Sequence, residues 1–241
     1  MTTILVPYHG NERFPDDTIP VRPDVTVDPE LEGDDWEQLA RLNNATAEAV
    51  AAAGDRPLVF SGDCLIAGGV VAGLQRAGVD PAIVWFDGHG DVHTLETTTS
   101  GYLGGLSLRL VNGAHPELYA DRIGLRPIAP ERAVLADARD LDPAEAAYLL
   151  TSATRRLTVP EVDPDTVPPG PLLVHVDADV LDADELPGLR FPVPGGPSTG
   201  DLLAACERLL ATGRVAALHV ACTWHSPASA LHAELLRALA G

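Results

Sequence analysis

Six short apolar runs rich in β-forming residues recur along the chain, and longer stretches with helical character lie between most of them. The apolar runs are residues 3–6, 57–60, 82–86, 133–136, 172–176 and 216–221. The clearest helical stretches are residues 39–53, 142–150 and 199–210. Since parallel strands are joined by long crossovers that are usually helices, this alternation predicts a mostly parallel sheet with helices on both faces.

The chain is long enough for one large α/β domain. It has 241 residues, of which 46% are hydrophobic, and this allows a sizeable core. No linker, repeat or low-complexity tract divides it, so we expect a single domain over residues 1–241. No apolar run reaches the roughly 18 residues that cross a membrane. The first residues lack the basic and apolar segments of a signal peptide, so a cytoplasmic location is expected.

The chain is strongly acidic, which narrows its expected partners. It contains 16 Lys and Arg against 35 Asp and Glu, for a formal net charge of −19. A field of that sign repels nucleic-acid phosphates and anionic membrane surfaces, so we expect neither as a partner. The three cysteines are too few for a disulfide framework, and we expect reduced thiols.

Two apolar runs end in clusters of ionisable side chains, in the segments VWFDGHGDVHT and LLVHVDADVLD. Alternation with period two places the members of each cluster on one face of an extended chain. Buried carboxylates repel one another unless something compensates their charge, and a divalent cation such as Mn²⁺ would do so. The residues are Asp87, His89 and Asp91 in the first segment, and Asp177 and Asp179 in the second.

A simpler interpretation is that these aspartates only end strands and cap the turns that follow. For a single aspartate we would favour that interpretation, but two clusters behind hydrophobic strands weaken it. A third apolar run ends in Gly62-Asp63-Cys64. Cys64 is either a small buried hydrophobe or a thiolate ligand for a metal, and the residue pattern leaves both open.

Taken together, the motifs resemble those of the ureohydrolase family, which includes the arginases and agmatinases. The family motifs G-G-D-H, D-A-H-x-D and S-x-D-x-D-x-x-D-P have counterparts at 61–64, 87–91 and 175–182. Further similar segments are TLETTTSGYLGG at 94–105, ADARDLDPAE at 136–145 and FPVPGGPS at 191–198. The resemblance implies an arginase-like three-layer α/β/α fold with a mostly parallel sheet, and two divalent metal ions, with Mn²⁺ expected.

The resemblance also implies roles for individual residues. One ion would be held by Cys64, Asp87, Asp91 and Asp177. The other would be held by Asp87, His89, Asp177 and Asp179. Two cations lower the pKa of a shared water, and Asp91 would be the catalytic residue that orients it and passes a proton to the leaving amine. The substrate would be a small molecule with a planar carbon flanked by nitrogens.

The sequence departs from the family pattern at several positions. Cys64 replaces a histidine ligand, Gly104 replaces the histidine that shuttles protons in arginases, and Cys222 replaces the glutamate that pairs with the guanidinium. Cys64 and the DGHGD and GYLGG segments resemble the hydroxyarginine amidinohydrolase branch more closely, since that branch also has cysteine at the ligand position and lacks the shuttle histidine. Thr98 and Ser100 match carboxylate-binding loop positions, although hydroxyls there are also ordinary turn formers. The expected substrate-binding residues are His93, Thr98, Ser100, Tyr102 and Cys222.

We therefore predict a binuclear metal hydrolase that cleaves a C–N bond of a guanidino, hydroxyguanidino or amidino compound. Two alternatives stay open. The missing histidine and glutamate are compatible with a catalytically silent binding protein of the same fold, and a neutral pocket around Cys222 fits a metal-dependent amide or formamide hydrolase. Because the family is often trimeric or hexameric, a homo-oligomer is also among the expectations.

Overall fold

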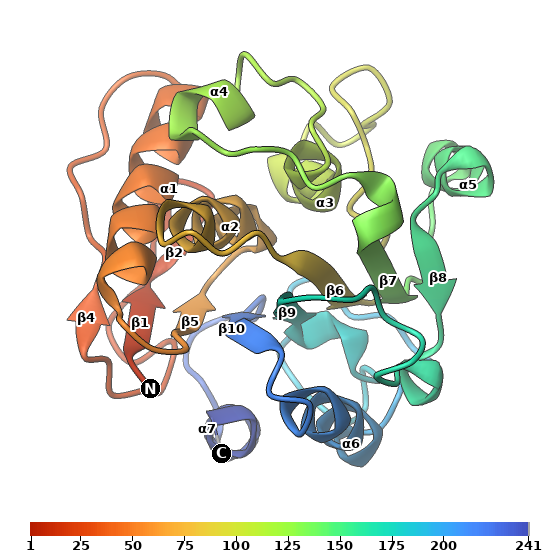
Figure 1. Ribbon diagram of the computed structural model, residues 1–241. Coiled ribbons are helices and arrows are strands. Elements are labelled where there is room, and N and C mark those ends of the chain that lie inside the picture. Colours follow the sequence, from red (N-terminus) through yellow and green to blue (C-terminus); the bar gives the residue numbers. More distant parts are fainter. Residues whose placement is uncertain (241) are drawn as a thin grey trace.

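The computed structural model describes residues 1–240 and is built on an eight-stranded sheet in which all neighbouring strands are parallel (Figure 1). Across the sheet the strands are β4 (Val25–Thr26), β1 (Thr3–Val6), β5 (Leu58–Ser61), β10 (Val215–Ala221), β9 (Leu172–Asp177), β6 (Ala82–Asp87), β7 (Ala133–Asp137) and β8 (Arg155–Leu157). A short antiparallel pair, β2 (Tyr8–His9) and β3 (Glu12–Arg13), lies apart from it. The expectation of a mostly parallel sheet is confirmed.

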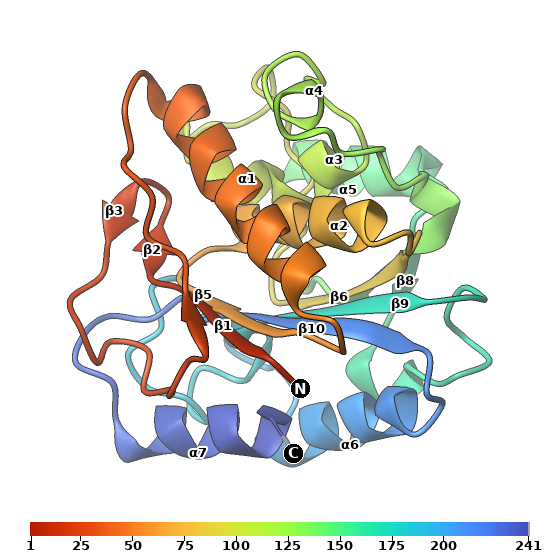
Figure 2. The same cartoon turned by 60° about the vertical axis from the view of Figure 1, so that its left-hand side comes forward.

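Helices cover both faces of the sheet and complete the three layers (Figure 2). One face carries α1 (Asp35–Ala52), α2 (Ala67–Arg76), α3 (Ser107–Val111), α4 (Ala120–Ile123) and α5 (Pro143–Thr151). The other face carries α6 (Thr199–Leu210) and α7 (Ala230–Ala240). Single 3₁₀ turns are η1 (Cys64–Ile66), η2 (Leu103–Leu106), η3 (Pro130–Arg132), η4 (Val159–Glu161) and η5 (Ala178–Val180). The α/β/α layering is therefore confirmed.

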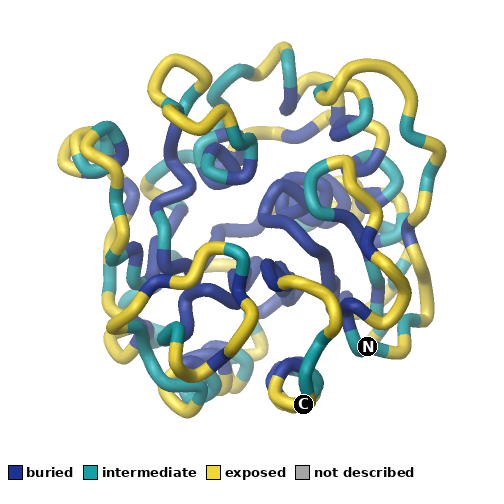
Figure 3. The backbone as a smooth tube through the Cα atoms, turned by 180° about the vertical axis from the view of Figure 1, so that it is seen from behind, coloured by how far each residue is buried: buried dark blue, intermediate teal, exposed yellow. Residues whose placement is uncertain are grey.

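The sheet is buried on both faces because its strands alternate between two apolar cores. In β6, Ile83 and Trp85 join the core under α1 and α2, whereas Val84 and Phe86 join the core under α6 and α7. Figure 3 shows this buried centre inside a shell of exposed loops. Within residues 1–240, no helix combines the length and hydrophobicity needed to cross a membrane.

Side-chain caps fix where the helices begin. Asp34 caps α1 through a capping box with Glu37, so this helix begins earlier than the apolar pattern of residues 39–53 suggested. The helix expected over residues 142–150 is confirmed as α5, and Asp142 is its N-cap and forms a capping box with Glu145. The 199–210 helix is confirmed with the bounds expected for α6.

The carboxyl ends of the central strands meet at one edge of the sheet. Ala221 at the end of β10 is paired with Ser61 on one side and with Asp177 on the other. Asp87 ends the neighbouring strand β6. In open α/β sheets the ligand crevice lies beyond this edge, and the segments expected to be metal-binding come together there.

Candidate metal centre

Asp87 and Asp177 are the last residues of two adjacent strands, and each folds back onto the turn that follows it. Asp87 Oδ1 accepts a hydrogen bond from the His89 amide at 2.7 Å, and Asp177 Oδ1 accepts one from the Asp179 amide at 2.9 Å. Trp85 Nε1 donates to the other oxygen of Asp87 at 2.9 Å. Both aspartates thus do cap turns, and the same bonds also hold their carboxylates at the strand ends.

His89 is bracketed by two of these carboxylates. Its Nδ1 lies 3.3 Å from Asp179 Oδ2 and 3.5 Å from Asp87 Oδ1. Burial alone would lower the pKa of His89, but the hydrogen bonds and charges of Asp179 and Asp87 outweigh it and raise the pKa to about 12. One donor atom from each of these three residues lies within 4.8 Å of the others, a spacing that suits a shared cation.

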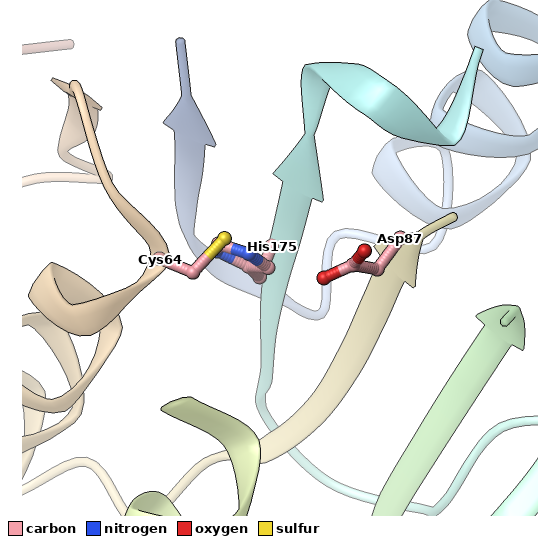
Figure 4. Close-up of side chains that lie close together, drawn as sticks. All are labelled: Cys64, Asp87 and His175. Carbon is pink, nitrogen blue, oxygen red and sulfur yellow. The ribbon is translucent and has the colours of Figure 1, made fainter. Parts of the chain in front are cut away.

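Cys64 lies at the site and not only in the core. It opens the turn after β5, and its Sγ donates a hydrogen bond to Asp177 Oδ2 at 2.8 Å. Burial, followed by the charges of Asp177, Asp91 and Asp87, raises the pKa of the thiol. Cys64 forms a second candidate ligand group with Asp87 and His175, whose donor atoms also lie within 4.8 Å of one another (Figure 4).

Asp91 is buried with one oxygen unsatisfied. Its backbone has φ of 53°, the left-handed region that non-glycine residues rarely adopt. Its Oδ2 has no hydrogen-bond partner among the described residues. Burial and the charges of Asp87 and Asp177 raise the pKa of Asp91 well above its usual value.

These side chains fit a pair of divalent cations. Asp87, Asp91, Asp177 and Asp179 are all at most 6% exposed, and among residues 1–240 the ion pairs they form all involve His89. Burying four carboxylates beside one imidazole is costly without further positive charge. The donor set of carboxylate oxygens, imidazole and thiol is one that binds divalent transition metals.

A cavity of about 290 Å³ opens above this cluster. Five expected ligands line it, and the sixth, Asp87, lies beneath them. Its wall adds three further acidic side chains, Asp140, Asp142 and Glu145, and no arginine lines it within the described chain. The remaining lining residues are His93, Ser100, Tyr102, Gly104, Gly105, Phe191 and Thr223.

The loop residues expected to contact substrate divide into two groups. His93, Ser100 and Tyr102 line the cavity, and His93 Nε2 lies 3.0 Å from Asp142 Oδ2. Thr98 does not line it; its Oγ1 accepts a hydrogen bond from the Gly101 amide at 3.2 Å, which is a turn-forming role.

Cys222 also lies away from the cavity. It is fully buried in the core under α6 and α7, whereas its neighbour Thr223 lines the cavity and donates to Asp177 Oδ1 at 2.5 Å. Burial, and then the charge of Asp177, raises the pKa of the Cys222 thiol, so the thiol is neutral as well as outside the cavity lining. Because the side chains of an extended chain alternate between its two faces, Cys222 and Thr223 point to opposite sides. An alignment of the motif shifted by one residue therefore exchanges which of the two faces the cavity.

Tyr102 occupies the space above Gly104. A Cβ added at Gly104 would lie 2.3 Å from Cε1 of the Tyr102 ring. The ring is held in place because its hydroxyl donates to Asp63 Oδ2 at 2.6 Å. The position of the arginase shuttle histidine is therefore filled by a different side chain.

Arg139, which the sequence did not single out, anchors the turn that carries Asp179. Its guanidinium donates to the carbonyls of Asp179 at 3.3 Å, Val180 at 2.9 Å and Leu181 at 3.1 Å. It also donates to the carbonyl of Val193 at 2.7 Å. Its place in the ADARDLDPAE segment was the available signal.

Comparisons with known proteins agree with this geometry. The family model described as the arginase family matches residues 8–227. The arginase of Bacillus subtilis is 34% identical over 170 residues, which are 65% of this chain and 57% of that protein. The N(omega)-hydroxy-L-arginine amidinohydrolase of Streptomyces lavendulae is 30% identical over 189 residues, 73% of this chain and 66% of that protein. The matched stretches thus span somewhat more than half the length of these relatives.

Solved structures show the same fold over nearly the whole chain. An arginase of Entamoeba histolytica in complex with L-ornithine superposes with a TM-score of 0.81 at 17% identity, covering 99% of this chain and 96% of that one. An arginase of Bacillus subtilis superposes with a TM-score of 0.79 at 25% identity, covering 99% and 97%. With the family model matching most of the residues and the motifs converging on one cavity, the chain belongs to the arginase family, as its motifs predicted.

Proposed function

We propose that the protein is a hydrolase that uses two divalent cations to cleave a C–N bond in a small guanidino, hydroxyguanidino or amidino compound. The observation that carries this proposal is the convergence of six ligand-type side chains from three separate strand ends, five of which line one cavity. The activities named for the relatives, arginase and hydroxyarginine amidinohydrolase, are of this reaction class. Mn²⁺ suits the group of two carboxylates and one imidazole at Asp87, His89 and Asp179.

The ligand assignment is the one that the family resemblance implies, and the two groups in the structure contain four of its six residues, Cys64, Asp87, His89 and Asp179. Cys64, Asp87, Asp91 and Asp177 would hold one ion, and Asp87, His89, Asp177 and Asp179 the other. Bound ions supply the reaction with a water of lowered pKa. Asp91 is the acid–base candidate because its Oδ2 is unpaired and the residue lines the cavity. Thr223 orients Asp177 from the opposite side of the cluster.

The charge of the cavity supports a substrate that is neutral or cationic. Asp140, Asp142 and Glu145 line the wall beyond the proposed metal ligands, with His93 held between Thr97 and Asp142. A carboxylate-bearing end of a substrate finds no arginine there among residues 1–240. We infer that an amino or guanidino group of the substrate points toward this acidic wall, and that His93, Ser100 and Tyr102 contact the substrate.

A second candidate, hydrolysis of an amide or formamide, is favoured by one observation. Within the described chain, the segment just after β10 contributes only the neutral Thr223 to the cavity lining, since Cys222 is buried in the core. Nothing there would neutralise a guanidinium from that direction. The acidic side chains that line the same cavity make the guanidino or amidino substrate the better match.

The test is a turnover assay of the metal-loaded protein on a panel of guanidines, hydroxyguanidines, amidines and formamides. We expect urea, hydroxyurea or ammonia release from a member of the first three classes, and loss of that release in Asp91→Asn. Release from formamides alone would favour the second candidate. Full metal occupancy without turnover of any panel member would contradict both and favour a catalytically silent binding protein.

A further inference from the structure

We propose that His175 is an additional ligand of the ion held by Cys64, which makes that half of the centre a nitrogen–sulfur site with a preference for Zn²⁺ or Co²⁺ over Mn²⁺. This inference rests on the proposed two-ion centre and deepens it. It concerns a position at which this chain has His175 and the family motif S-x-D-x-D-x-x-D-P has serine.

The sheet places His175 directly below the carboxylates. It precedes Asp177 by two residues on β9, so both side chains point to the same face. Its neighbours across the sheet are Trp85 on β6 and His219 on β10. His175 is fully buried, and its ring centroid lies 3.7 Å from that of Trp85.

A chain of hydrogen bonds fixes which nitrogen of His175 carries the proton. The hydroxyl of Ser61 donates to the Asp63 carbonyl at 2.8 Å, so it must accept from His219 Nε2, which lies 2.7 Å away. His219 is fully buried and forms no ion pair with a carboxylate within the described chain, so its ring is neutral, and with the proton on Nε2 the ring has a bare Nδ1. That atom accepts from His175 Nδ1 at 2.8 Å.

The remaining nitrogen, His175 Nε2, therefore carries no proton, and its lone pair is buried. It has no hydrogen-bond partner among the described residues. A ring nitrogen of His175 lies within 4.8 Å of both Cys64 Sγ and an Asp87 oxygen, and the close-up shows the three side chains lying close together from three separate segments of the chain (Figure 4). A buried acceptor left without a partner costs folding free energy, whereas a metal ion would satisfy it.

The two halves of the centre then differ in chemical character. The half at His89 offers one imidazole and carboxylate oxygens, which suits Mn²⁺. The half at Cys64 offers a thiolate and an imidazole in addition to carboxylates, which suits Zn²⁺ or Co²⁺. Ser61 and His219 orient the new ligand in the way that outer hydrogen bonds commonly orient metal-bound histidines.

His232 supplies a matched control. It too is buried, its ring lies 4.3 Å from that of Trp224, and its Nε2 has no partner among the described residues. Its Nδ1 contacts Ser229, and it belongs to no candidate ligand group within the described chain. A histidine that merely fills the core should behave like His232 when it is replaced.

The experiment measures metal coordination directly. Zinc X-ray absorption of the full chain loaded with two Zn²⁺ should show two imidazole nitrogens per chain, from His89 and His175, at about 2.0–2.1 Å and one sulfur at about 2.3 Å. His175→Ser should remove one imidazole and weaken the tighter Zn²⁺ site by about 10–100-fold. Its Mn²⁺ affinity should change less than about threefold. His232→Ser should alter neither.

A single imidazole in the wild-type spectrum would overturn the inference and would leave the proposed hydrolase intact. Equal loss of Zn²⁺ and Mn²⁺ affinity in His175→Ser would also overturn it. Two imidazoles without turnover of any substrate would instead contradict the proposed function and support the ligand. Because the wild-type spectrum counts the imidazoles by itself, the test holds even if His175→Ser fails to fold.

Discussion

Gly104 and Tyr102 define the environment of the site at the scale of single residues. Restoring a histidine at position 104 alone should fail, because its Cβ would overlap the Tyr102 ring. We expect Gly104→His to lower stability by about 1–3 kcal/mol and to give no gain in turnover. Adding Tyr102→Ala should recover most of that stability, which thermal unfolding of the two variants would measure. A single Gly104→His variant as stable as the wild type would contradict this packing.

Replacing Asp91 by Asn should lower the activity of the protein and raise the stability of its metal-free form. Because Asp91 is the acid–base candidate, we expect Asp91→Asn to lower kcat by about 10²–10⁴-fold. Removing its buried, unpaired charge should at the same time raise the thermal stability of the chelator-treated protein. Turnover and unfolding of the same Asp91→Asn preparation test both effects. A variant that keeps its activity, or whose metal-free form is less stable, would contradict the assignment.

At the scale of elements, Arg139 joins the turn after β9 to the 193–194 loop. Arg139→Gln leaves several buried carbonyls without a donor, and we expect at least about 2 kcal/mol of destabilisation. Because Asp179 lies in that turn, the second of the two ions should also bind more weakly. Chemical denaturation and Mn²⁺ titration measure the two effects. Arg126→Gln, which removes an exposed pair with Asp80, is the control and should change neither.

Strand positions and ligand clusters could be predicted from the sequence because period-two patterns and strand ends are local features. Asp87, His89 and Asp91 are within one short segment, and their convergence with Asp177 follows from a parallel sheet. What β10 contributes could not be predicted in the same way. Whether Cys222 or Thr223 faces the cavity depends on the pleat of that strand, and a shift of one residue reverses it.

Long-range hydrogen bonding was equally beyond sequence reasoning. The carbonyls that Arg139 binds are about 40 to 55 residues away in the chain, and only the folded structure brings them together. The same is true of the contact between His175 and His219. The local sequence around Arg139 and around His175 is ordinary, and the role of each is set by residues that are distant in the sequence.

At the scale of the whole molecule, the buried carboxylates make stability depend on pH. Burial, and then the charge of Asp87, raises the pKa of Asp179 from 3.8 to about 6, and the pKa values of Asp91 and Asp177 are also raised well above their usual range. A raised folded pKa means that the folded state holds the proton more tightly than the unfolded state does. The resulting stabilisation is complete below about pH 4 and is lost as the pH rises through 6 and above.

The chelator-treated protein should therefore become less stable between about pH 4 and pH 7, and added metal should stabilise it more at the upper end. Thermal unfolding with and without Mn²⁺ across this range measures the effect. The control for general repulsion among the many surface acidic residues is the double variant Asp177→Asn with Asp179→Asn. In this variant we expect a smaller loss of stability as the pH rises. If the double variant loses as much stability with rising pH as the wild type does, these two carboxylates are not the cause of the pH dependence.

The most direct test of the metal centre is a count of bound ions by equilibrium titration of the chelator-treated protein with Mn²⁺, followed by metal analysis. The account predicts two ions per chain for the wild type and none for Asp87→Ala combined with Asp177→Ala, which removes both shared carboxylates. The account would be contradicted if the wild type bound no ion and the double variant were at least as stable as the wild type.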